Sequence, residues 1–170
     1  MKSLSVIWIV MPILFLNSAC TSNITKSLQC KQEVLIESLP TDSDIYINGE
    51  FIGKTPMKLN LNSDMSHEIN FKKVGFKSAK ESIGPTYKYE EKPFLQFGFA
   101  KDLGYYYRLS KDHIIAELPW EHLPNSAGIV PFETMGELIT KADSAFHSGD
   151  LSSEEHKIVI HQIITFFDEL

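Results

Sequence analysis

A glycine–lysine–threonine run, Gly53-Lys54-Thr55, is the first pattern in this chain that could do chemistry, because such runs can hold phosphate. A phosphate loop also needs a glycine five residues before its second glycine, and Asn48 stands at that position. The loop must open a helix, whereas Pro56 and the alternating residues 57–61 predict a strand. We therefore expect no nucleotide binding here.

The histidines and the paired acids have no spacing typical of metal binding or acid–base catalysis. Zinc needs three or four convergent ligands, and no two histidines have the i, i+4 spacing that places a pair on one helix face. Acid–base catalysis needs carboxylates that face each other across a cleft, whereas adjacent acids are typical of solvated turns and helix ends. We expect no catalytic residue, no metal site and no cofactor among His67, His113, His122, His147, His156, His161, Glu90-Glu91, Glu154-Glu155 and Asp168-Glu169.

The first 19 residues have the organisation of an export signal. One positive charge, Lys2, precedes an apolar run over residues 4–16, and small or polar residues 17–19 follow it. The run is too short for a membrane-spanning helix, which takes about 20 apolar residues. We therefore expect a cleaved signal peptide rather than a permanent anchor.

Cys20 follows this signal directly, and Ser18-Ala19-Cys20 resembles the bacterial lipobox, although Asn17 stands where the lipobox has leucine. The resemblance implies that Cys20 carries the lipid attachment, with acyl chains such as palmitate that anchor the chain in the bacterial cell envelope. Thr21 after the cysteine favours the periplasmic side of the outer membrane over the inner membrane. The alternative is ordinary secretion after Ala19, in which case Cys20 and Cys30 could form a disulfide.

The charge of the chain argues against two classes of partner. The formal charge is −6, and the loss of Lys2, the only charged residue of the signal, makes it −7. Acidic proteins are poor ligands for nucleic acid and for anionic lipid. We expect no nucleic acid partner.

Residues 20–32 are polar and predict a tether, and residues 33–83 alternate with the period of two that half-buried strands show. Asn48-Gly49 predicts a tight hairpin because both residues tolerate a positive φ. From Ile45 to Gly49, then from Gly53 to Met57 and at Gly75-Phe76, the pattern resembles the PEGA domain. Its signature here comprises Pro40, Asn48, Gly49, Gly53, Thr55, Pro56 and Gly75.

The resemblance implies a small antiparallel β-sandwich-like module that serves as an accessory part of envelope structures and has no enzymatic activity. After it, residues 84–126 form an aromatic-rich second β region, with strands expected at 105–109 and 113–118. Residues 127–170 change to a helical period and predict a two-helix hairpin, in which Ser152 and Glu155 form a capping box.

The second helix of this hairpin is apolar over more than half its circumference. Packing within the chain is one explanation, and a face that docks a partner is the other. Residues 127–170 hold eight acids and two basic residues, so such a partner would be basic or apolar. The candidate interaction face comprises Ile160, Ile163, Ile164 and Phe167.

The sequence thus predicts an α+β protein that is not an enzyme. It is expected to be a membrane-anchored lipoprotein that binds or scaffolds envelope proteins or cell-wall components. The alternative is a small periplasmic enzyme or ligand carrier whose site lies in the aromatic residues 94–107.

Overall fold

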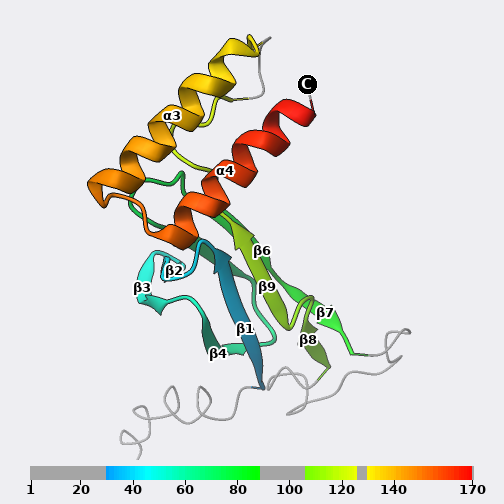
Figure 1. Ribbon diagram of the computed structural model, residues 1–170. Helices are drawn as coiled ribbons and strands as arrows, with labels where there is room; N and C mark the ends of the chain where they lie inside the picture. Colours follow the sequence, from blue (N-terminus) through cyan, green and yellow to red (C-terminus); the bar gives the residue numbers. More distant parts are fainter. Residues whose placement is uncertain (1–29, 89–105, 126–129, 170) are drawn as a thin grey trace, which may run out of the picture.

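The computed structural model describes residues 30–88, 106–125 and 130–169, and it confirms the α+β class (Figure 1). Strands occupy the first two of these ranges and two helices the third. The elements in chain order are β1 (Lys31–Leu39), β2 (Asp44–Ile47), β3 (Glu50–Lys54), β4 (Met57–Asn62), β5 (His67–Lys72), β6 (Ala79–Ile83), β7 (Pro85–Tyr87), β8 (Tyr107–Leu109), β9 (His113–Glu117), α3 (Glu133–Ser148) and α4 (Ser153–Asp168).

Two sheets share one hydrophobic core. One has the strand order β4-β1-β9 and the other the order β3-β2-β5-β6. Alternate residues of their strands are buried, as the period of two predicts, and Ile36 of one sheet belongs to the same buried cluster as Ile45 and Phe71 of the other. The predicted sandwich-like module is therefore present, and long-range pairing of β1 with β4 and of β2 with β5 builds its two sheets.

Strand β9 joins the first sheet from far along the chain. It pairs in parallel with β1, with Ile36 opposite Ile114 and Ser38 opposite Ala116. The strands expected at 105–109 and 113–118 exist as β8 and β9, but β8 pairs with β7 while β9 pairs with β1. The second β region thus supplies one strand, β9, to the sheet β4-β1-β9.

Turn residues behave as their chemistry predicts. Asn48 has φ 51° and Gly49 φ 89°, so both central residues of the β2–β3 hairpin lie in the left-handed region. The Asn48 side-chain oxygen also accepts a hydrogen bond from the backbone N–H of Glu68 at 3.0 Å. The turn is thereby fixed to strand β5 as well as to its own hairpin.

The helical hairpin is confirmed, with its ends where the sequence places them. Gly149 ends α3 with φ 85°, and its N–H bonds back to the carbonyl of Phe146. The capping box at the start of α4 is complete: the Ser152 hydroxyl accepts from the Glu155 N–H, and the Glu155 carboxylate accepts from the Ser152 N–H. Among the described residues, neither helix is long and apolar enough to cross a membrane.

One amide group attaches the hairpin to the β part. The Gln162 side chain of α4 accepts from the Trp120 N–H and donates to the Leu118 carbonyl, both at 2.9 Å. These backbone groups follow β9 directly, and both residues are buried. In Figure 1, β1 and β9 run toward α4, so the hairpin covers the end of the sheets where these strands finish.

Candidate functional site

The signature threonine holds a buried polar network rather than an open site. The Thr55 hydroxyl lies 2.6 Å from the Ser38 hydroxyl and accepts from the Ser43 N–H at 3.0 Å. Both serine hydroxyls also donate to the carbonyl of Pro40, at 2.6 Å from Ser38 and 2.9 Å from Ser43. Because the three hydroxyl side chains are buried, this network satisfies the groups that a turn between β1 and β2 would otherwise leave unpaired.

The remaining signature residues also shape the chain. A Cβ on Gly53 would lie 3.2 Å from the sulfur of Met57, so glycine leaves room for the Met57 side chain against the β3 backbone. Gly75 has φ 82°, and its carbonyl accepts from the Glu121 N–H at 3.0 Å, which links the β5–β6 connection to the segment after β9. Pro56 is exposed and begins the turn into β4. The signature therefore accounts for fold, not for chemistry.

The four residues of the predicted interaction face do not lie on one open surface. Ile163 is fully buried, and Ile160 and Phe167 are half-buried against the core. Ile164 is 40 % exposed. The hairpin thus buries most of this apolar stripe within the chain.

Two predicted sites fall largely outside the described residues. Cys20 is one of them, and residues 94–105 of the aromatic alternative are the other. Tyr107 at the end of that alternative is described: its ring centroid lies 5.1 Å from that of Tyr87, and the hydrogen bond between the two raises the pKa of Tyr107. Cys30, the other cysteine, is half-buried, and its carbonyl accepts from the N–H of Ser63 at 2.9 Å.

Four of the histidines, His67, His113, His147 and His156, each lie within hydrogen-bond distance of one carbonyl or carboxylate oxygen. His67 bonds to the carbonyl of Asn62 at 2.9 Å, and His156 bonds to Asp143 across the helical hairpin at 2.8 Å. Across residues 30–88, 106–125 and 130–169, no three histidine, cysteine or acidic side chains converge as a metal site would require.

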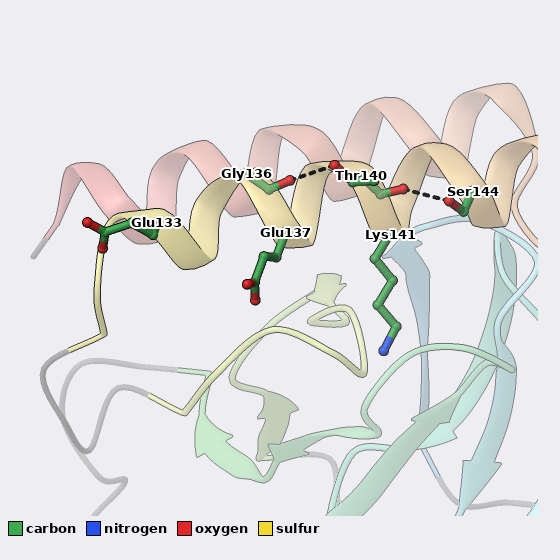
Figure 2. A pocket seen from close by; sticks show the side chains of 6 residues that line it. All are labelled: Glu133, Gly136, Glu137, Thr140, Lys141 and Ser144. Carbon is green, nitrogen blue, oxygen red and sulfur yellow. Dashed lines mark hydrogen bonds between the residues drawn. The ribbon is translucent and has the colours of Figure 1, made fainter.

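A surface hollow of about 580 Å³ lies along α3, and Figure 2 shows the residues that line it. All of them belong to this one helix. The hydroxyls of Thr140 and Ser144 donate to the carbonyls of Gly136 and Thr140, at 2.9 and 2.8 Å, so they are turned back onto their own backbone. Within the part of the chain that the structure describes, no second element therefore contributes a lining group that could converge on a ligand in this hollow.

A second hollow, of about 420 Å³, lies where edge strands β3 and β4 face each other. Ile52 and Leu59 contribute apolar surface, and Asn48, Asn60 and Lys31 contribute polar groups. Strands at the edges of two sheets can accept an extended peptide.

A third candidate is the outer face of the four-stranded sheet, opposite the core. Tyr46 of β2 and Phe51 of β3 are cross-strand neighbours with ring centroids 5.5 Å apart in an edge-to-face arrangement. The ammonium of Lys72, from β5, lies 4.7 Å from the centroid of the Tyr46 ring. Phe51 is 54 % exposed, so an aromatic surface beside a cation is open to solvent.

Charged and amide side chains surround these rings. Glu68 accepts from Asn70 at 3.0 Å and pairs with Lys80 at 3.1 Å, and these two hydrogen bonds lower the pKa of Glu68. Lys54 lies 3.7 Å from Asp44 on the same face. We call this surface the outer aromatic face; it comprises Asp44, Tyr46, Phe51, Lys54, Glu68, Asn70, Lys72 and Lys80.

The outer aromatic face was not predicted from the sequence, although part of its signal was present there. A two-residue turn at Asn48-Gly49 places Tyr46 opposite Phe51, and the strand period puts both on the side away from Ile45. The position of Lys72 depends on the long-range pairing of β2 with β5, which alternation alone does not indicate.

These features define an α+β protein with a two-sheet β module, a docked helical hairpin and an exposed aromatic face. Residues 31–95 match the family model of the PEGA domain, which confirms the resemblance found in the sequence. No curated protein and no solved structure gives a significant match. The family match ends before β9, so the first sheet of this protein includes a strand from outside the matched region.

Proposed function

We propose that the chain is a lipid-anchored protein of the bacterial cell envelope whose PEGA domain acts as a non-catalytic binding or scaffold module. The observation that carries this proposal is the use of the signature residues. Thr55 and Pro40 belong to a buried network, and Gly49, Gly53 and Gly75 set turns or close approaches. Because these residues serve the fold, we assign the module a binding or scaffold role and look for its function on its surface.

The anchor part of the proposal rests on Cys20 at the end of the export signal. A diacylglyceryl group on its sulfur, joined by a further acyl chain on the new N-terminus, would hold the chain firmly, because each buried methylene adds about 0.8 kcal/mol of membrane affinity. We place the folded part at the periplasmic face of the outer membrane, beyond the polar tether.

The two cysteines give a matched test of the anchor. Mass spectrometry of the mature N-terminus should find residue 20 acylated, and Cys20→Ser should release the chain from the membrane fraction. Cys30→Ser should leave acylation and fractionation unchanged. A free Thr21 N-terminus, or an unmodified Cys20 in a disulfide with Cys30, would disprove lipid anchoring.

The partner is expected to be an envelope protein or a cell-wall component. A photo-crosslinking residue at Ile164 tests the exposed part of α4, and one at Phe51 tests the outer aromatic face. Crosslinks to another envelope component in intact cells support the binding role. Crosslinks only between copies of this chain, from both positions, would count against it.

A further inference from the structure

We propose that the outer aromatic face binds a carboxylated polysaccharide through Phe51, Lys72 and Asn70. This inference rests on the proposed function and names the partner class for one surface. Three kinds of group lie together on the four-stranded sheet: an exposed aromatic ring, an ammonium and a side-chain amide. A sugar ring with a carboxylate can match all three: its apolar C–H face fits the aromatic ring, its carboxylate fits the ammonium, and its hydroxyls fit the amide.

The aromatic part fits one face of a sugar ring. The negative face of an aromatic ring attracts the polarised C–H groups on the apolar face of a pyranose, as it attracts other positive edges. Lys72 lies over the ring of Tyr46, so the ring of Phe51 is the more open of the pair. The edge-to-face contact with Tyr46 holds Phe51 in place before the ligand arrives.

The charge on this face favours an acidic sugar over a neutral one. Lys54 and Lys80 each have a carboxylate partner, Asp44 and Glu68, whereas the structure shows Lys72 against an aromatic ring. Three lysines against two acids leave the face at +1, in a chain whose formal charge is −6. An ammonium has three donors, so Lys72 can remain over Tyr46 and still donate to a ligand carboxylate.

The polar groups on this face favour a polysaccharide over a lipid bilayer. Asn70 and Glu68 present an amide and a carboxylate on the same face of the sheet as Phe51, and these groups can hydrogen-bond to sugar hydroxyls. A bilayer surface would instead require a larger apolar area than one exposed aromatic ring offers. Vesicle binding is therefore the main competing outcome of the test.

Affinity electrophoresis of the full chain in mild detergent gives the test, with polygalacturonate as the carboxylated polysaccharide and dextran as the neutral one. We expect retardation by polygalacturonate, stronger than by dextran and weakened by salt. Phe51→Ala should lower the affinity about tenfold, which corresponds to about 1.4 kcal/mol. Phe51→Tyr should restore binding, and Lys72→Met should lower the affinity about threefold and reduce its salt dependence.

Matched controls come from the helical hairpin. Phe132→Ala removes another exposed aromatic ring, and Lys157→Ala removes another exposed lysine; both should leave retardation unchanged. Equal retardation by dextran, binding only to phosphatidylglycerol vesicles, or retardation that survives Phe51→Ala would each overturn the proposal. If the acylation of Cys20 and the crosslinks from Ile164 persist in that case, the proposed function stands without this ligand.

Discussion

The ammonium of Lys73 lies 3.0 Å from a carboxylate oxygen of Glu155, and the two side chains are only 16 % and 17 % exposed. This pair joins the end of the β5 region to the first turn of α4. Lys73 also donates to the Thr41 carbonyl at 2.7 Å, and Glu155 accepts from the Ser152 N–H at 2.8 Å. The pair therefore couples the helix cap to the β module.

The first prediction concerns the pH dependence of this contact. Burial acts to raise the pKa of Glu155, but the hydrogen bonds with Ser152 and Lys73 outweigh it and lower the pKa below its ordinary 4.5. The contribution to stability is therefore complete above about pH 4.5 and is lost as the pH falls through the folded-state pKa. In urea unfolding, Glu155→Gln should be less stable than the parent chain at pH 7, and the difference should shrink in acid.

Glu154 supplies the control for that experiment, because it is the exposed neighbour in the same helical turn. Glu154→Gln should change stability little at any pH. Lys73→Met should cost about 1–3 kcal/mol at pH 7, because it leaves a half-buried carboxylate without its cation. A difference between parent and Glu155→Gln that grows in acid would contradict the proposed coupling.

The second prediction concerns the amide that docks the hairpin. Gln162→Leu leaves the Trp120 N–H and the Leu118 carbonyl without their partner, and burial makes such groups costly. We expect a loss of about 1–3 kcal/mol in the free energy of unfolding. Trp120 is 2 % exposed and is the only tryptophan after the predicted signal, so a red shift of its emission in a chain lacking Trp8 would report water entry. His161→Leu, at the exposed neighbouring position, should leave emission and stability unchanged.

The third prediction separates the hydroxyl of Thr55 from its shape. Thr55→Val keeps the volume but removes the bonds to Ser38 and Ser43, so it should lower the free energy of unfolding by about 1–3 kcal/mol. Thr55→Ser keeps the hydroxyl and should lose less. Thermal unfolding followed by circular dichroism measures both variants. A larger loss in Thr55→Ser than in Thr55→Val would mean that the methyl group, not the hydroxyl network, accounts for the contribution of Thr55.

Local chemistry predicted the features that depend on neighbouring residues. The Asn48-Gly49 turn follows from a tolerance for positive φ, and the cap at Ser152 follows from its spacing to Glu155. The parallel pairing of β9 with β1 did not follow, because a period of two says which face is buried but not which strand lies alongside. Contacts such as Lys73 with Glu155 join residues 82 positions apart, and single-residue patterns carry no signal for them.

The candidate surfaces show the same difference between local patterns and long-range pairing. The apolar stripe of α4 predicted a possible partner face, but its period of 3.6 is equally that of a helix packed on a core, and Ile163 is buried. The outer aromatic face was missed because Lys72 and Lys80 reach the face only through long-range strand pairing, although the two rings lie on one hairpin. Lys72 reaches Tyr46 only through the pairing of β2 with β5.

The last prediction uses two glycines of α3 with opposite roles. Gly136 lies inside the helix, and a Cβ there would meet nothing within 4 Å, so Gly136→Ala should stabilise the chain by about 0.5–1 kcal/mol. Gly149 has φ 85° at the helix end, and Gly149→Ala should cost about 1–2 kcal/mol because a Cβ is strained in that conformation. Thermal unfolding of both variants compares one substitution in two backbone conformations. Gly136 also lines the hollow along α3 (Figure 2). If Gly136→Ala weakens a crosslink from Ile164 to a partner without lowering stability, that hollow has a binding role, although all its lining residues come from one helix.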